Sequence, residues 1–273
     1  MADAALRLVS APRPGGGRPA SFWRFEGSPP PGTGRTPLLA LPGLGLDGRA
    51  FDRLAPLAAD RDLVLANLPN AMPGEPDMAA FGREALAVLD AAGHRGRPAV
   101  VAGSSFGGMV ALSLALEAPD RVAAIVLVGT SPGWPSLSAR LRALSRVHRW
   151  IPRRPYPTIL AEVMLPRFRW IDPAVREGLR VQMLHRTKEF VGACVDAMRA
   201  FDAAPRLGQV RAPALVIHGD GDRVFPHSAA ALLAERLPRA ELRTFPRCGH
   251  LPHLSHPAET VREVGAFLAK EGL

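Results

Sequence analysis

A serine that could act in chemistry lies at the centre of the pattern Gly103-x-Ser105-x-Gly107. The apolar, β-branched run before it predicts a buried strand, and the small and apolar residues after it are compatible with a helix. A serine on such a sharp turn has its hydroxyl held exposed, and the flanking glycines let strand and helix cross closely. The free amides of the helix would also face the group that the serine attacks. The stretch therefore predicts a nucleophile at Ser105.

A nucleophilic serine needs a base to take its proton and a third group to orient that base. A loop with Asp220 and Asp222 follows a strand predicted at 214–217. His250 follows a strand predicted at 241–245. Open α/β sheets place their sites at the carboxyl ends of strands, so these groups are expected beside the serine. From the residues alone, the choice between the two aspartates stays open.

The elements that must position these groups alternate between strands and helices along the chain. Strands that are apolar throughout and alternate with helices are typical of a parallel sheet covered on both faces. We therefore predict an α/β fold with a mostly parallel central sheet, helices on both faces, and a hairpin from 6–10 and 21–26 at one edge. The other predicted strands are 38–41, 63–66, the run before Ser105, 122–128, 214–217 and 241–245, and the predicted helices of this part are 51–59, 78–92, the segment after Ser105, 228–237 and 257–269.

The alternation stops between 131 and 205, where no run resembles a strand. Four helices punctuated by prolines are predicted there, at 137–150, 158–164, 173–184 and 188–201. We interpret residues 131–205 as a helical cap inserted into a single core domain made of 1–130 and 206–273.

Composition excludes several other classes of protein. No apolar run approaches the roughly 18 residues of a membrane span, and residues 1–20 lack the apolar region of a signal peptide, so a cytoplasmic protein without membrane contact is expected. The two cysteines, Cys194 and Cys248, cannot form a disulfide framework and have no histidine at metal-binding spacing. No metal site and no cofactor are expected, and nothing indicates an oligomeric state.

The net charge of +9 is concentrated in the predicted cap, where 12 arginines and one lysine stand against six acidic residues between 131 and 205. A solvated face in an arginine-rich chain is the simpler interpretation, and attraction of an anionic substrate or an acidic carrier protein is the functional one. No nucleic-acid-binding motif accompanies the charge, so no nucleic-acid partner is expected. The arginines in question are Arg140, Arg142, Arg146, Arg149, Arg153, Arg154, Arg167 and Arg169.

With these motifs in order, the chain from residue 38 onward resembles the α/β-hydrolase superfamily, in particular its lidded serine esterases and lactonases. The segments Gly219-Asp220-Gly221-Asp222-Arg223-Val224-Phe225-Pro226 and Gly249-His250-Leu251-Pro252 match family motifs at their expected places. The resemblance implies that Ser105 is the nucleophile, His250 the general base and then acid, and Asp222 the group that orients the imidazole. It favours Asp222 because the family's acid precedes the Arg-x-x-Pro of this loop.

The resemblance also implies an oxyanion hole formed by the amides of Leu44 and Phe106. The family's usual His-Gly-x-Gly is here Pro42-Gly43-Leu44-Gly45, which removes a side chain that can brace the loop but leaves the backbone donors in place. Candidate pocket residues from the same comparison are Gly43, Met109, Trp134, Phe225 and His253.

These observations predict a cofactor-independent serine hydrolase that cleaves a small-molecule carboxylic ester or lactone through an acyl-enzyme. An anionic or carrier-bound ester is one version of that substrate. Alternatives are hydrolysis of a C–C bond or acyl transfer by the same triad, and a ligand-binding protein without catalysis on the same fold.

Overall fold

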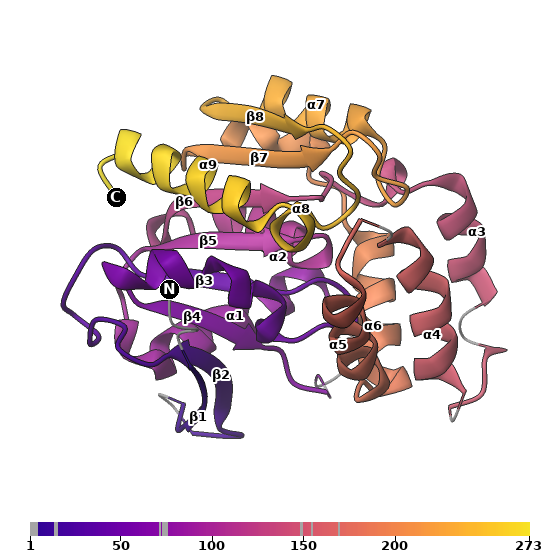
Figure 1. The fold of residues 1–273 in the computed structure, drawn as a ribbon, viewed down its shortest axis with the longest axis horizontal. Coiled ribbons are helices and arrows are strands. Elements are labelled where there is room, and N and C mark those ends of the chain that lie inside the picture. Colours follow the sequence, from indigo (N-terminus) through magenta and orange to yellow (C-terminus); the bar gives the residue numbers. More distant parts are fainter. Residues whose placement is uncertain are drawn as a thin grey trace.

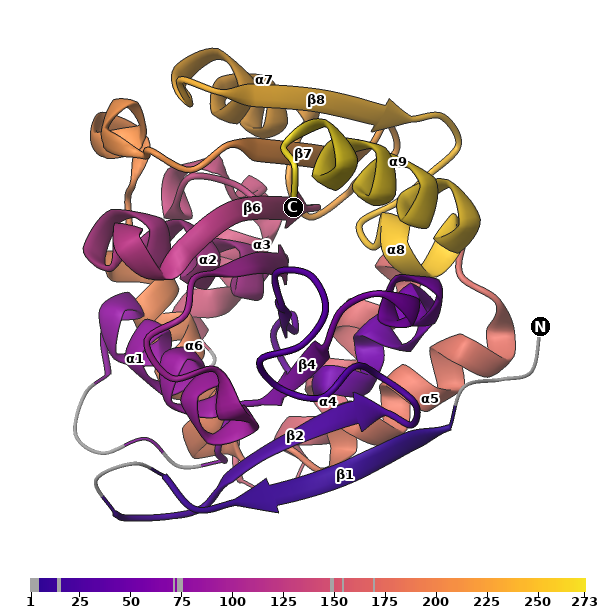
Figure 2. The same cartoon turned by 90° about the vertical axis from the view of Figure 1, so that its left-hand side faces the viewer.

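The computed structural model describes residues 5–13, 16–70, 72, 76–147, 150–153, 155–168 and 170–273. Its strands form one eight-stranded sheet in the order β1-β2-β4-β3-β5-β6-β7-β8 (Figures 1 and 2). From β4 to β8 every neighbouring pair is parallel, whereas the pairs β1/β2 and β2/β4 are antiparallel. The strands are β1 (Leu6–Ala11), β2 (Ala20–Phe25), β3 (Leu38–Leu41), β4 (Leu63–Asn67), β5 (Ala99–Ser104), β6 (Val122–Val128), β7 (Ala214–Gly219) and β8 (Ala240–Phe245).

Side chains of the sheet alternate between two apolar layers. On β3, Leu39 and Leu41 belong to a cluster shared with helices α1 (Met78–Leu89), α2 (Phe106–Glu117) and α7 (His227–Arg236). Leu38 and Ala40 belong to the opposite cluster, beneath α9 (Pro257–Lys270) and the 3₁₀ segment Gly48–Ala59. Because both faces are covered, the central strands β3, β5 and β7 are buried along their whole length, and most of their residues are apolar. The prediction of a mostly parallel α/β sheet with helices on both faces is confirmed.

Helix ends follow local sequence signals. The side chain of Asp77 accepts a hydrogen bond from the amide of Ala80 at 2.7 Å and caps the start of α1. The chain leaves that helix through a wider turn at Asp90–His94, in which Gly93 has a φ of 98°. The segment predicted as a helix at 51–59 starts earlier, at Gly48, and forms 3₁₀ turns with Pro56 inside it.

Residues 131–205, which we call the helical insertion, contain the predicted helices. They are α3 (Ala139–Val147), α4 (Tyr156–Met164), α5 (Pro173–Leu184) and α6 (Lys188–Ala200), and among the described residues of this range no strand occurs. The end of the predicted helix 137–150 reaches residues 148 and 149, which lie outside the described part. Figure 1 shows these helices gathered beside one end of the sheet.

The two ends of the helical insertion lie side by side. Gly133 and Asp202 form an isolated antiparallel bridge, and the amide of Ala203 donates to the carbonyl of Pro132 at 2.8 Å. An insertion whose ends meet leaves the strand pairing of β6 and β7 intact. The division into a core domain and a cap stays a prediction.

Candidate active site

Ser105 follows β5 directly and has an unusual backbone conformation, with φ at 52° and ψ at −116°. A side chain at positive φ is strained, and such strain persists only where surrounding contacts fix it. Two hydrogen bonds do so: the Ser105 amide donates to the Val128 carbonyl at 3.0 Å, and Thr130 Oγ1 donates to the Ser105 carbonyl at 2.6 Å. The serine therefore stands on a fixed turn between β5 and α2.

Three glycines around Ser105 are required because other backbone or side-chain atoms leave no room for a Cβ. A Cβ atom added at Gly103 would overlap the backbone of Gly107, and one added at Gly107 would overlap the carbonyl of Leu41. A Cβ atom at Gly108 would lie 2.6 Å from the side chain of Thr130. The spacing of glycines in the motif thus reflects the crossing of β5, α2 and the end of β3.

Asp222 and His250 form a buried hydrogen-bonded pair beyond the ends of β7 and β8. Nδ1 of His250 lies 2.9 Å from Oδ2 of Asp222, and each side chain is 1% exposed. Oδ1 of the same carboxylate accepts from the amides of Val224 at 2.7 Å and Phe225 at 3.2 Å. The other sequence candidate, Asp220, is exposed and its Oδ1 accepts from the amide of Cys248 at 3.3 Å. Only Asp222 of these two aspartates contacts the imidazole.

Charges around Asp222 keep it ionised. Burial opposes ionisation, but the neighbouring His250, its hydrogen bond and the more distant His218 together hold the pKa of Asp222 below its ordinary value. Nε2 of His218 lies 3.8 Å from Oδ2 of Asp222, and burial lowers the pKa of His218. An ionised Asp222 favours the tautomer of His250 that carries its proton on Nδ1.

The remaining nitrogen of His250 is available for chemistry. Nε2 is buried and has no hydrogen-bond partner in the part of the chain that the structure describes. The loop after β6 joins His250 to the serine turn: Val128 binds the Ser105 amide, and a Cβ atom added at the next residue, Gly129, would overlap the His250 carbonyl and lie 3.5 Å from its Nδ1. The structure therefore brings Ser105, Asp222 and His250 together at the carboxyl ends of the parallel strands.

The predicted oxyanion residues, Leu44 and Phe106, lie at the same ends of the strands. A Cβ atom added at Gly43 would be 3.4 Å from Cβ of Ser105, so this loop contacts the serine. The loop turns at Leu44 and Gly45, closed by a hydrogen bond of 3.1 Å from the Leu46 amide to the Gly43 carbonyl. Gly45 has a φ of 80°, which suits the third position of a tight turn. The amide of Phe106 is at the first position of α2, where helix amides lack intrahelical partners.

Two aromatic residues of the helical insertion, Phe168 and Trp170, cover the loops that carry the candidate pair. The ring of Phe168 is stacked on that of His250, with centroids 6.2 Å apart and an interplanar angle of 10°. Cβ atoms added at Gly221 and Gly249 would collide with the Trp170 ring. Neither aromatic was predicted from the sequence. The only signal was the glycine directly before each candidate residue, Gly221 before Asp222 and Gly249 before His250.

An apolar cavity of about 120 Å³ lies between α3, α4 and α6. Its walls include Leu44 of the candidate oxyanion loop and Val224 of the loop that carries Asp222. Among the predicted pocket residues, Trp134 lines this cavity and Gly43 contacts Ser105. The other three are packed in the interior: Met109 on the buried side of α2, Phe225 with its ring centroid 5.7 Å from that of His250, and His253 stacked on Phe51 with centroids 4.7 Å apart.

A second, basic depression of about 440 Å³ adjoins the apolar cavity, since Trp134 and Ser145 line both. Its other walls include Arg142, Arg146 and Arg199, and none of these three forms an ion pair within the described residues. Three further arginines of the predicted basic stretch, at 149, 154 and 169, lie outside the described residues, as does the side chain at 140.

In the described part of the chain, no cluster of histidine, cysteine or acidic side chains has the arrangement of a metal site. Helices long and apolar enough to cross a bilayer are likewise absent from that part.

Comparison with known proteins identifies the family. A sequence model of the alpha/beta hydrolase family matches residues 38–263. The chain belongs to the alpha/beta hydrolase family. As an alpha/beta hydrolase it resembles an esterase from Thermogutta terrifontis, whose structure superposes with a TM-score of 0.81 over 97% of this chain and 99% of the other at 24% identity. That likeness supports the fold.

Similar sequences carry hydrolase names. The pimeloyl-[acyl-carrier protein] methyl ester esterase of Chromobacterium violaceum is 32% identical over 85% of this chain and 93% of its own length. The 2-hydroxy-6-oxononadienedioate/2-hydroxy-6-oxononatrienedioate hydrolase 1 of Dechloromonas aromatica is 31% identical over 83% of each chain. This alpha/beta hydrolase is therefore an enzyme that catalyses hydrolysis.

Proposed function

We propose that this enzyme hydrolyses carboxylic esters through an acyl-enzyme on Ser105, with His250 as general base and acid and Asp222 as the orienting carboxylate. The observation that carries the proposal is the hydrogen bond of 2.9 Å from His250 Nδ1 to Asp222. It leaves a buried Nε2 that has no partner among the described residues, at the carboxyl ends of the strands where Ser105 also lies. Nucleophilic catalysis by a serine requires an imidazole of fixed orientation with one nitrogen free to take the serine proton, and this pair supports such a role.

The first half of the reaction acylates the enzyme. Nε2 of His250 takes the proton of Ser105 Oγ while Oγ bonds to the ester carbonyl carbon, whose oxygen becomes negative. The amides of Leu44 and Phe106 donate to that oxygen. The C–O bond to the alcohol then breaks, and His250 returns its proton to the departing alkoxide. The alcohol leaves and the acyl group stays on Ser105.

The second half releases the acid. His250 removes a proton from a water molecule whose oxygen attacks the acyl carbon, and the tetrahedral oxyanion again faces the two amides. When the bond from carbon to Oγ breaks, His250 gives the proton back to Ser105. The products are a carboxylic acid and the free enzyme, so no external oxidant, reductant or metal is consumed.

The apolar cavity supports a substrate with an acyl chain or a ring. It adjoins Leu44, so an acyl group bound there has its carbonyl close to the proposed oxyanion amides. The similarity to a carrier-protein methyl ester esterase favours an ester over a lactone. A lactone fits the same chemistry.

An anionic or carrier-bound ester is the second candidate substrate. It is favoured by the basic depression next to the apolar cavity, where Arg142, Arg146 and Arg199 have no carboxylate partner among the described residues. Electrostatic attraction of this kind weakens as salt screens it. If kcat/KM for an anionic ester is insensitive to added salt, this version of the substrate is rejected.

The testing experiment is a panel of nitrophenyl esters of increasing acyl length, with a lactone, a carrier-bound methyl ester and a dienedioate of the kind named for the Dechloromonas relative. We expect ester turnover that Ser105→Ala abolishes and that Ser113→Ala, a change at another buried serine of α2, preserves. Preferred turnover of the dienedioate would contradict the ester assignment. Full ester turnover by Ser105→Ala would contradict the proposed nucleophile.

A further inference from the structure

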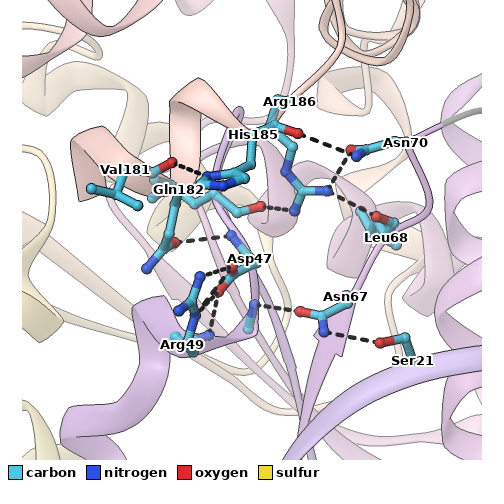
Figure 3. Close-up of polar contacts among 12 residues, drawn as sticks. Ser21, Asp47, Arg49, Asn67, Leu68, Asn70, Val181, Gln182, His185 and Arg186 are labelled. Carbon is cyan, nitrogen blue, oxygen red and sulfur yellow. Dashed lines mark hydrogen bonds and ion pairs between the residues drawn. The ribbon is translucent and has the colours of Figure 1, made fainter. Parts of the chain in front are cut away.

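Three consecutive residues, beginning with the last residue of the Leu44 turn, have backbone groups held by distant side chains (Figure 3). Two of those side chains, Gln182 and Arg186, come from the helical insertion, and the third comes from the end of β4. The contacts are Arg186 Nη2 to the Leu46 carbonyl, the Asp47 amide to Gln182 Oε1 at 3.1 Å, and the Gly48 amide to Asn67 Oδ1 at 3.0 Å.

Arg186 connects several segments through this network. Its side chain also donates from Nη1 to the Leu68 carbonyl and to Asn70 Oδ1, each at 3.0 Å. The residue is 8% exposed, and within the described part of the chain it forms no ion pair with a carboxylate. A buried guanidinium that uses its donors on backbone carbonyls fixes the position of those carbonyls.

The guanidinium is itself held in place. It lies over the ring of Phe190, 4.8 Å from the centroid. The next residue, Thr187, donates from Oγ1 to the Asn70 carbonyl at 2.9 Å and accepts from the Phe190 amide at 3.1 Å, which caps α6. The junction between α5 and α6 is therefore tied to the core on both sides of Arg186.

The carbonyl that Arg186 binds belongs to the turn that carries Leu44. The amide of Leu46 closes that turn through the Gly43 carbonyl, so Leu46 is held at its nitrogen by the turn and at its oxygen by Arg186. The turn also packs directly on the helical insertion, since a Cβ atom added at Gly45 would lie 3.1 Å from Leu160 and 3.3 Å from Met183. The position of the Leu44 amide thus depends on the insertion.

We propose that Arg186, assisted by Gln182, is a positioning residue that holds the Leu44 amide in the oxyanion hole through the carbonyl of Leu46. The inference rests on the proposed function of Leu44. It explains how the loop is held in place although Pro42 supplies no side-chain donor: the supporting contacts come from the helical insertion instead of from the loop itself.

The expected effect on catalysis is selective. An oxyanion donor acts when it lies 2.7–3.1 Å from the developing charge, and loss of one donor costs about 10²–10³ in kcat. A displaced donor retains part of that effect, so Arg186→Met should lower kcat by about tenfold to a hundredfold and change KM by less than about twofold. Arg186→Lys should rescue little, because an ammonium cannot reproduce the planar fork that reaches three oxygens.

Hydrogen exchange tests the brace without any assay of activity. In Arg186→Met, amides of residues 43–48 should exchange at least about tenfold faster than in the wild type, because local opening of the loop becomes easier. The matched control is Arg180→Ala, which removes an arginine of α5 that pairs with Glu177 near the surface and should leave both exchange and kcat unchanged. If Arg186→Met fails to fold, Gln182→Leu makes the same test through the Asp47 amide.

Kinetics of the same variants complete the test. Faster exchange of residues 43–48 together with a fall in kcat at constant KM supports the positioning role. Wild-type exchange in a folded Arg186→Met, or faster exchange with wild-type kcat, overturns it. An increase of KM alone also overturns it, because that pattern marks substrate binding. Absence of ester turnover in the wild type instead overturns the proposed function, while the exchange result still decides whether Arg186 braces the loop.

Discussion

Nδ1 of His250 and Oδ2 of Asp222 lie 2.9 Å apart, in a pair of side chains that are each 1% exposed. The second carboxylate oxygen is bound by the amides of Val224 and Phe225, so the carboxylate cannot rotate away from the imidazole without breaking those bonds. The negative charge is therefore fixed where an imidazolium would form during proton transfer.

Replacing Asp222 by asparagine tests this role. Asp222→Asn keeps the side-chain shape and one acceptor but removes the charge and favours the wrong tautomer of His250, so kcat should fall by about 10²–10⁴. Asp220→Asn is the matched control, because Asp220 is exposed and does not contact the imidazole. Steady-state kinetics on one nitrophenyl ester measure both. A larger loss of kcat in Asp220→Asn than in Asp222→Asn would show that Asp220, not Asp222, is the orienting carboxylate.

His253 predicts a dependence of stability on pH. Burial, with a contribution from the charge of His250, lowers the pKa of His253 from 6.5 to about 3, so the folded protein keeps this imidazole neutral while the unfolded chain protonates it. The unfolded state then binds more protons between pH 6.5 and about 3. The contribution of His253 to the free energy of unfolding should therefore be fully present above pH 6.5, and the free energy of unfolding should fall as the pH decreases through this window.

The variant His253→Phe isolates that contribution. Phenylalanine preserves the stacking on Phe51 and cannot be protonated, so the decline of the unfolding free energy should become shallower by up to about 1.4 kcal/mol per pH unit. Urea unfolding at several pH values between 4 and 7, roughly the span of this titration, measures it. Identical slopes for variant and wild type would show that His253 does not remain neutral in the folded state.

Two glycine substitutions should have opposite effects on stability. In Gly107→Ala the new Cβ would overlap the Leu41 carbonyl, so we expect a loss of about 3 kcal/mol or more. Gly178 lies within α5 and has ordinary helical φ, and apart from its own helix no atom of the described residues lies within 4 Å of an added Cβ. Gly178→Ala should therefore stabilise by roughly 0.5–1 kcal/mol. Thermal and urea unfolding give both values. Tolerance of alanine at position 107 would contradict the close crossing of α2 and β3.

The apolar cavity should set the preferred acyl length. Val195→Phe extends a side chain of α6 into the cavity, so kcat/KM should fall about tenfold for long acyl esters and change by less than about twofold for acetyl esters. Val181→Phe, on the exposed side of α5, is the matched control and should leave the profile unchanged. An unaltered preference in Val195→Phe would place the acyl group elsewhere.

Much of the fold was predictable because local patterns and global architecture agree. The apolar run at 122–128 became β6 with the predicted bounds, and the hairpin at 6–10 and 21–26 became β1 and β2 at the sheet edge. Errors concern ends and helix type, as at Gly48–Ala59, where Pro56 lies inside 3₁₀ turns. Those details depend on packing beneath the sheet, which no local pattern encodes.

The candidate site was predictable where function has a local motif and not where it depends on distant contacts. The strained turn at Ser105 follows from its glycines, and the loops with Asp222 and His250 follow from strand ends. Arg186 has no such signal, because its partner carbonyl at Leu46 is 140 positions away in the chain. The aromatic cover by Phe168 and Trp170 was missed for the same reason.

The central claim is that Ser105 forms a covalent intermediate, and labelling with a fluorophosphonate probe tests it most directly. Such a probe phosphonylates a serine that is activated by its neighbouring base. Peptide mapping by mass spectrometry should locate one adduct on Ser105 in the native chain, and none should form in Ser105→Ala. Absence of an adduct on the native chain, or equal labelling of Ser105→Ala, would contradict the account.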